Sequence, residues 1–141
     1  MANLVVDASV AAAWCFSDEN SIYSNAVLKS LAGITPFAPR LWAYEIRNSV
    51  LMGLRRTRIS QQHADLFISS LQKLNFQLVD PVSYDIIFNL AQAYGLTMYD
   101  AAYLDLALRE GAQLASLDAA LRKAAVKAGV LIFDPAAWDL P

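Results

Sequence analysis

A short apolar run near the start of the chain, Leu4-Val5-Val6, ends abruptly at a carboxylate, Asp7. The run predicts a strand buried on both faces, as in a parallel sheet that helices cover on either side. Residues 8–16 follow as a helix, so the chain turns away directly after the acid. In open α/β sheets, ligands bind beyond the carboxyl ends of the strands. Asp7 is therefore expected at a place where a site forms.

The rest of the chain alternates short strands with helices that glycine often ends, which predicts an α/β fold. Further strands are expected at 76–79, 113–116 and 130–133, and further helices at 21–32, 41–56, 61–73, 82–94, 98–109 and 118–128. Thr35 to Pro39 is extended, and its two prolines confine it to a sheet edge or a loop. We expect one domain, residues 1–141, with about five short parallel strands and about seven helices on both faces of the sheet, an α/β/α sandwich.

Composition narrows the class of protein. The net charge is −2, so no basic field indicates a nucleic-acid partner, although acids held by a metal would not count toward that balance. The single Cys15 excludes a disulfide framework and a Cys-rich zinc site. No apolar run reaches the ~20 residues of a membrane span, and no basic leader precedes an apolar stretch, so a cytoplasmic protein is expected. Hydrophobic residues make up 57% of the chain, an excess that points to a dimer or a bound protein partner.

Glu45 is an acid in an unexpected place. It borders the apolar stripe of its helix, close to Trp42 and Ile46. A buried carboxylate is unfavourable unless a cation or several hydrogen-bond donors compensate it. The conventional alternative is an acid at the margin of the stripe that pairs with Arg47 or Arg40.

Two further acids begin helices. Asp100 follows the capping residue Thr97 by three positions, as in a capping box, but its helix has an apolar face that should pack on the sheet. Asp118 follows a strand, and its conventional interpretation is an N-cap. Because parallel strands end at one edge of the sheet, Asp118 and Ser116 are expected near Asp7.

One explanation covers four acids together: Asp7, Glu45, Asp100 and Asp118. Carboxylates that converge at the strand ends repel one another unless a divalent cation holds them. With one Cys and one His in the chain, the donors are hard oxygens, which favours Mg²⁺ or Mn²⁺ over zinc or copper. Such cations serve phosphoryl transfer to water. Asp105 stands apart, because its spacing to Arg109 predicts an ordinary surface ion pair.

Four segments, in order, resemble the motifs of PIN domains. They are Val5-Val6-Asp7-Ala8-Ser9, Glu45-Ile46-Arg47-Asn48, the segment from Thr97 to Tyr103, and the segment from Leu114 to Leu121. Their order, their spacing and the chain length are similar to those of the VapC-like toxins of type II toxin–antitoxin pairs. The resemblance covers nearly the whole chain, and its specificity lies in the four motifs together.

The resemblance implies a metal-dependent endoribonuclease that hydrolyses RNA phosphodiester bonds with metal-activated water. The catalytic and metal-binding positions are Asp7, Glu45, Asp100 and Asp118. The supporting positions are Ser9, Asn48 and Ser116, the last a hydroxyl where the family commonly has Thr. The resemblance also implies Mg²⁺, for which Mn²⁺ can substitute, a homodimer, and a cognate antitoxin that reaches the active site with a basic residue. Glu45 either completes the metal site or orients the attacking water.

Basic side chains offer contacts to RNA phosphates. The candidates are Arg40, Arg47, Arg55, Arg56 and Arg58. The last three lie between two predicted helices, where they are expected at the mouth of the cleft. The alternative is a solvated, basic helix end that suits the helix dipole.

Two other classes of function compete with the nuclease. A phosphoryl-transfer α/β domain, such as a receiver domain or a haloacid-dehalogenase-like phosphatase, needs a second acid or an acceptor aspartate. Position 9 is Ser9, Asp80 is a weak acceptor candidate, and no glycine-rich phosphate loop occurs. A non-catalytic PIN-fold protein-binding module would use an apolar face for its partner, but the four intact acids argue against it.

Overall fold

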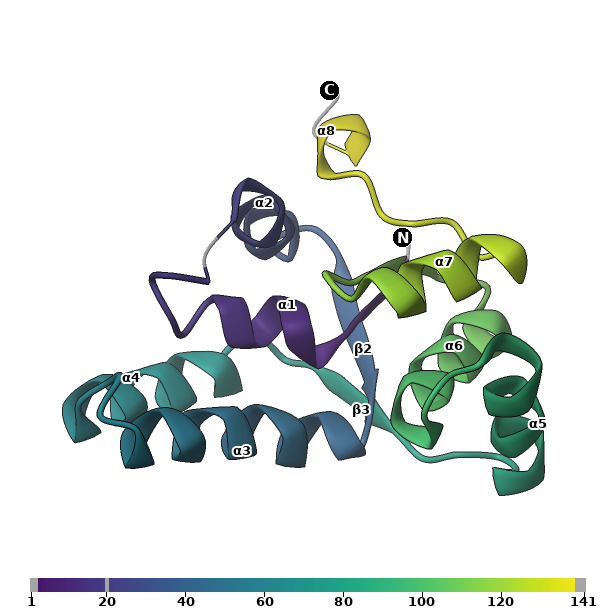
Figure 1. Ribbon diagram of the computed structural model, residues 1–141. Coiled ribbons are helices and arrows are strands. Elements are labelled where there is room, and N and C mark those ends of the chain that lie inside the picture. Colours follow the sequence, from purple (N-terminus) through teal and green to yellow (C-terminus); the bar gives the residue numbers. More distant parts are fainter. Residues whose placement is uncertain (1–2, 20, 139–141) are drawn as a thin grey trace.

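The computed structural model describes residues 3–19 and 21–138, and it contains one parallel sheet with strand order β3-β2-β1-β4 (Figure 1). The strands are β1 (Asn3–Val6), β2 (Thr35–Pro39), β3 (Gln77–Val79) and β4 (Gln113–Ala115). The helices are α1 (Ala8–Ala13), α2 (Ile22–Ser30), α3 (Leu41–Arg55), α4 (Gln61–Gln72), α5 (Tyr84–Tyr94), α6 (Met98–Glu110), α7 (Ala119–Lys127) and α8 (Pro135–Trp138). The predicted α/β fold with a central parallel sheet is confirmed.

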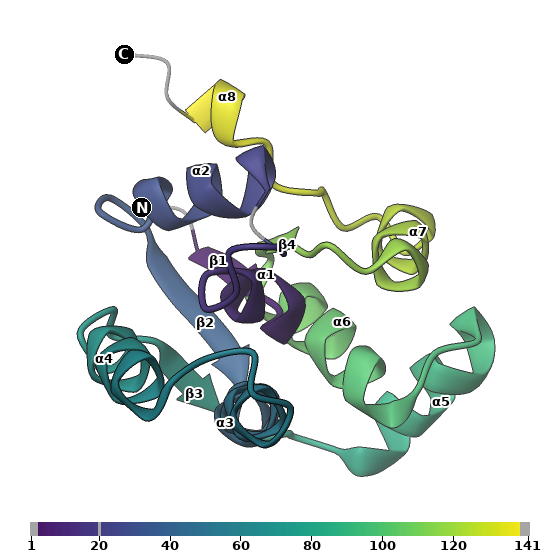
Figure 2. The same cartoon turned by 60° about the vertical axis from the view of Figure 1, so that its left-hand side comes forward.

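β1 is buried on both faces, as its unbroken apolar run predicts. Val5 joins an apolar cluster with Ile46 of α3 and Leu104 of α6. Leu4 points to the other face and joins a cluster with Val27 of α2. All five side chains are at most 1% exposed. Figure 2 shows the same arrangement, with α2 on one side of the sheet and α3 and α6 on the other.

Helix ends follow the capping residues in the sequence. Ser60 accepts a hydrogen bond from the N–H of His63 at 3.1 Å and opens α4, and Thr97 opens α6. Gly95 and Gly111 end α5 and α6 in the left-handed conformation, with φ of 65° and 58°. Among the helices of residues 3–19 and 21–138, none has both the length and the apolarity to cross a membrane.

The predicted edge or loop position of β2 is wrong, because this strand lies inside the sheet between β1 and β3. The register explains how it tolerates two prolines. Pro36 is paired with β1 only, and Pro39 is paired with β3 only. Each proline therefore lies where β2 has a single neighbour, and only Phe37, between the prolines, is paired on both sides.

The fifth predicted strand, at 130–133, is reduced to one parallel bridge between Leu114 and Ile132. The N–H of Leu114 donates to the carbonyl of Leu131 at 3.0 Å, and the N–H of Phe133 donates to the carbonyl of Leu114 at 2.8 Å. β4 is only three residues long, so it offers little length for pairing. The chain then turns into α8, which the sequence patterns did not predict.

Asp105 forms the predicted ion pair with Arg109, at 3.0 Å, but the surface location is wrong. The residue is 4% exposed. α6 packs against the sheet and against α5, so residues 103–107 are all buried. The Asp105 carboxylate is therefore enclosed, while Arg109 is exposed.

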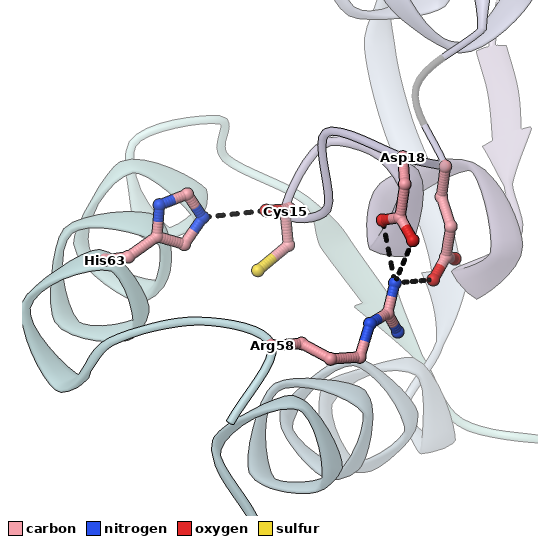
Figure 3. A network of polar contacts seen from close by, with 5 residues as sticks. Cys15, Asp18, Arg58 and His63 are labelled. Atoms are coloured by element: carbon pink, nitrogen blue, oxygen red, sulfur yellow. Dashed lines mark hydrogen bonds and ion pairs between the residues drawn. The ribbon is translucent and has the colours of Figure 1, made fainter. Parts of the chain in front are cut away.

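A polar clamp fastens the turn between α3 and α4 to the segment after α1 (Figure 3). Arg58 donates to Asp18 at 2.8 Å and to Glu19 at 2.8 Å, and its guanidinium lies 4.2 Å from the centre of the Phe16 ring. His63 Nε2 donates to the carbonyl of Cys15 at 2.7 Å. The clamp holds the far end of α3 against α1, whose N-terminus carries Asp7.

Candidate metal centre

Asp7 lies at the carboxyl end of β1, is 4% exposed and opens α1 as its N-cap. Its carboxylate accepts hydrogen bonds from the backbone N–H of Ser9 and from the hydroxyl of Ser116. The N–H of Asp7 donates to the carbonyl of Ala115 at 3.0 Å, so pairing between β1 and β4 continues to the acid. Burial raises the pKa of Asp7 despite these bonds, and the charge of Asp118 raises it further.

The turn after β4 is bonded to the turn after β1. The hydroxyl of Ser116, besides donating to Asp7, accepts the N–H of Asp118 at 3.0 Å. The hydroxyl of Ser9 accepts the N–H of Leu117, also at 3.0 Å. Asp118 is the N-cap of α7, so this network brings the start of α7 to Asp7.

Glu45 projects from α3 and is half-buried. The Tyr103 hydroxyl of α6 donates to its carboxylate at 2.6 Å. Burial raises the pKa of Glu45, the Tyr103 bond lowers it, and the charges of Asp7 and Asp100 raise it again. Burial also raises the pKa of the Tyr103 hydroxyl, so it stays protonated and donates.

The conventional alternative for Glu45, an ion pair with Arg40 or Arg47, is wrong. Arg40 pairs with Asp80 at 2.7 Å, and Arg47 donates to the carbonyl of Ala43 at 3.0 Å. The Glu45 carboxylate instead accepts its hydrogen bond from Tyr103 of α6.

Asp100 lies in the first turn of α6, where its N–H donates to the Thr97 hydroxyl at 3.1 Å. This is the N-cap half of the capping box that the sequence suggests. Its pKa is raised to about 6, first by burial and then by the charges of Asp118 and Asp7 and a hydrogen bond with Asp118. Asp100 and Asp118 are therefore direct neighbours, from two different helices.

The four acids share one electrostatic environment, and none of them forms an ion pair among the described residues. The ion pairs within residues 3–19 and 21–138 are those of Arg40 with Asp80, Arg58 with Asp18 and Glu19, and Arg109 with Asp105. None of them involves Asp7, Glu45, Asp100 or Asp118. Each acid whose pKa is raised owes part of the rise to another member of the set.

This donor set fits a hard divalent cation. All its members are carboxylate oxygens, and a cation would relieve the repulsion that contributes to the raised pKa values of Asp7, Glu45 and Asp100. In the part of the chain that the structure describes, no three acidic, histidine or cysteine side chains already stand together as a metal cage. Binding a cation therefore requires side-chain movement, and the contact between Asp100 and Asp118 is the one that a cation would replace.

The predicted RNA-contacting arginines lie in different surroundings. Arg55 and Arg56 are exposed at the end of α3, about 15 Å along the helix axis from Glu45. Arg58 is engaged in the clamp. Arg40 and Arg47 lie at the other end of α3, on the same helix as Glu45, and both are exposed.

Residues 4–127 match the family model described as PIN domain. The chain belongs to the PIN-domain family. This PIN domain is 32% identical over 119 residues to Ribonuclease VapC3 of Pyrobaculum aerophilum. The aligned region covers 82% of this chain and 88% of the relative.

Solved structures show the same fold as this PIN domain. PAE2754 from Pyrobaculum aerophilum matches with a TM-score of 0.63 and 23% identity, over 87% of this chain and 79% of the other. FitAcB from Neisseria gonorrhoeae matches with a TM-score of 0.64 and 17% identity, over 97% of this chain and 99% of the other.

The site of this PIN domain contains one residue that sequence reasoning missed, Tyr103. It lies three positions after Asp100, so both side chains fall on one side of α6, and that spacing could have indicated it. Asn48, predicted as a supporting residue, lies one turn after Glu45 on α3 and is exposed. The structure gives it no hydrogen bond among the described residues, so its role stays a prediction.

Proposed function

We propose that this PIN domain is a Mg²⁺-dependent endoribonuclease, the toxin of a VapBC-like toxin–antitoxin pair. One observation carries the proposal: four acids from separate elements share an environment without a basic partner. The relative named Ribonuclease VapC3 supports RNA as the class of substrate.

When bound, Mg²⁺, or Mn²⁺ in its place, supplies positive charge to the scissile phosphate and lowers the pKa of water. We assign its binding, as one ion or two, to Asp7, Asp100 and Asp118. Ser9 and Ser116 fix the orientation of the Asp7 carboxylate. Glu45, positioned by Tyr103, either completes the set or orients the attacking water and takes its proton, for which a raised pKa is suitable.

The proposal includes partners. We expect a single cytoplasmic domain, residues 1–141, that forms a homodimer and is neutralised by a cognate antitoxin. A groove of about 300 Å³ between α1, α2 and α4 supports a protein partner, because its lining is mainly apolar. Its floor and walls include Trp14, Leu28, Leu66, Phe67 and Leu74. A basic residue of the antitoxin would meet the uncompensated acids.

The test is cleavage of a mixed RNA pool in Mg²⁺ by purified variants. Asp7→Ala, Glu45→Gln and Asp100→Asn should each abolish cleavage and growth inhibition, because each removes an acid of the set. The matched control is Asp65→Asn, an exposed acid of α4, which should cleave like the wild type. Full cleavage by the Asp100 variant would show that the site assignment is wrong.

A further inference from the structure

The indole N–H of Trp42 is a buried donor without an acceptor among the described residues. Trp42 is 4% exposed and stacks on Phe76, with ring centroids 4.1 Å apart. Buried donors are rarely left unpaired, since desolvation without a bond is unfavourable. Trp14 offers the ordinary case, because its indole N–H donates to the carbonyl of Ser24 at 2.8 Å. Trp42 therefore differs from Trp14 in that its indole N–H has no acceptor among the described residues.

Trp42 lines a groove of about 540 Å³ beside β3, the edge strand of the sheet. We call it the Trp42 groove; its polar and aromatic lining consists of Arg40, Trp42, Tyr44, Arg47, Gln72, Asn75 and Phe76. Among the residues that the structure describes, no acidic side chain lines it. The groove therefore offers hydrogen-bond donors and the positive charge of Arg47, while the charge of Arg40 is paired with Asp80.

The N-terminus of α3 adds to this positive character. Its N-cap, Arg40, makes no side-chain capping bond to the N–H groups at the start of this 15-residue helix, of which that of Ala43 donates to the Arg40 carbonyl at 3.2 Å. The guanidinium of Arg47 donates to the carbonyl of Ala43 one turn back, at 3.0 Å. Uncapped N–H groups together with arginines suit an oxyanion.

We propose that the Trp42 groove binds phosphate oxygens of the RNA substrate, as a subsite separate from the four acids. The inference rests on the proposed function, because RNA is the substrate there. Glu45 lies between the groove residues Tyr44 and Arg47 in the sequence. A single-stranded RNA bound at the four acids can therefore continue around α3 to the groove. Since the Trp42 N–H is shielded, a groove side chain has to move before a ligand can reach it.

The first test follows the indole resonances of the ¹⁵N-labelled protein in EDTA, where no cleavage occurs. Inorganic phosphate should shift the Trp42 indole signal, assigned with Trp42→Phe, in a saturable way. The Trp14 signal should stay in place, because its donor is already bonded. A short single-stranded RNA should shift the Trp42 signal at lower concentration and compete with phosphate. If neither ligand moves the signal, the proposal is overturned.

The second test measures RNA affinity in EDTA as a function of salt. Arg47→Gln should weaken binding roughly 3- to 10-fold and reduce the slope of log affinity against log salt by about 0.7, the value for one single-strand phosphate contact. Trp42→Phe keeps the stacking and loses the donor, and should weaken binding roughly 2- to 10-fold. The control, Lys127→Gln, removes one exposed charge from α7 and should bind RNA like the wild type.

The outcomes separate the possible ligands and the two proposals. If phosphate moves the Trp42 signal but RNA does not, the groove takes free phosphate and the RNA assignment is wrong. If both groove variants bind RNA like the wild type, the subsite is wrong even where the wild type cleaves RNA. If RNA moves the signal but no metal supports cleavage, the groove stands and the nuclease proposal fails. If Trp42→Phe does not fold, the RNA affinity of Arg47→Gln and the titration of the wild type decide whether the groove binds phosphate.

Discussion

Three of the four acids of the candidate site also take part in helix capping. Asp7 caps α1, Asp118 caps α7, and Asp100 donates its N–H to the cap of α6. Capping and metal binding are compatible, because both need an oxygen at a helix N-terminus. Asparagine caps helices about as well as aspartate, so Asp→Asn variants separate the two roles where alanine variants would not.

The raised pKa of Asp100 predicts how stability depends on pH in the absence of metal. Its pKa is about 6 in the folded protein against 3.8 as the ordinary value, so the folded state binds the proton more tightly. The stabilisation is complete below pH ~4 and is lost as pH rises through 6. The free energy of unfolding, measured in urea with EDTA, should therefore fall between these pH values.

Asp100→Asn should flatten this pH dependence and raise the free energy of unfolding at pH 7.5, because it removes repulsion from Asp7 and Asp118. Asp65→Asn serves as the control and should keep the wild-type pH dependence. A variant of Asp100 that is strongly destabilised at pH 7.5 would favour a purely structural role for this acid.

Tyr103→Phe tests how Glu45 is held. The variant removes the hydroxyl that donates to Glu45 at 2.6 Å and leaves the buried ring in place. Because this bond lowers the pKa of Glu45, its loss should raise that pKa and move the acidic limb of the pH–rate profile of RNA cleavage to higher pH. The cleavage rate at neutral pH should fall about 10-fold, less than the roughly 10²- to 10⁴-fold that a positioned acid–base group contributes, because Glu45 itself remains. Tyr99→Phe, on an exposed ring, should leave the profile unchanged.

At the scale of elements, the close approach of α3 to the segment after α1 depends on Gly53. A Cβ at this position would lie 2.6 Å from Cε1 of Phe16. Gly53→Ala should therefore lower the free energy of unfolding by about 1–3 kcal/mol, although alanine favours helices. Urea denaturation measures this, and Phe16→Leu in the same chain should recover part of the loss. A Gly53 variant more stable than the wild type would show that the contact relaxes without strain.

Helices and strands could be predicted where nearby residues in the sequence determine them. They could not be predicted where contacts with another helix or strand determine their position. The caps of Ser60 and Thr97 and the apolar run before Asp7 depend on nearby residues, and the structure has them as expected. The place of β2 inside the sheet depends on the register of two other strands, which no local pattern of prolines contains. The burial of Asp105 likewise depends on α5.

At the scale of the whole molecule, the sheet turns four distant positions into neighbours. Parallel strand ends made the approach of Asp118 to Asp7 predictable. The contact of Glu45 with Tyr103 joins α3 to α6, and its geometry could not be predicted because it depends on how two helices cross. The direction in which the arginines turn is also a property of the assembled surface, as the pairing of Arg40 with Asp80 shows.

The most direct test of the central claim, that the four acids form a divalent-cation site, is thermal unfolding of the wild type and of Asp7→Asn in EDTA and across a Mn²⁺ titration at neutral pH. The wild type should gain stability with Mn²⁺, by about 2.7 kcal/mol at a hundredfold excess over the dissociation constant. Asp7→Asn should lose most of this gain. A wild type that melts identically with and without Mn²⁺ and Mg²⁺, or a variant that gains as much as the wild type, would contradict the account.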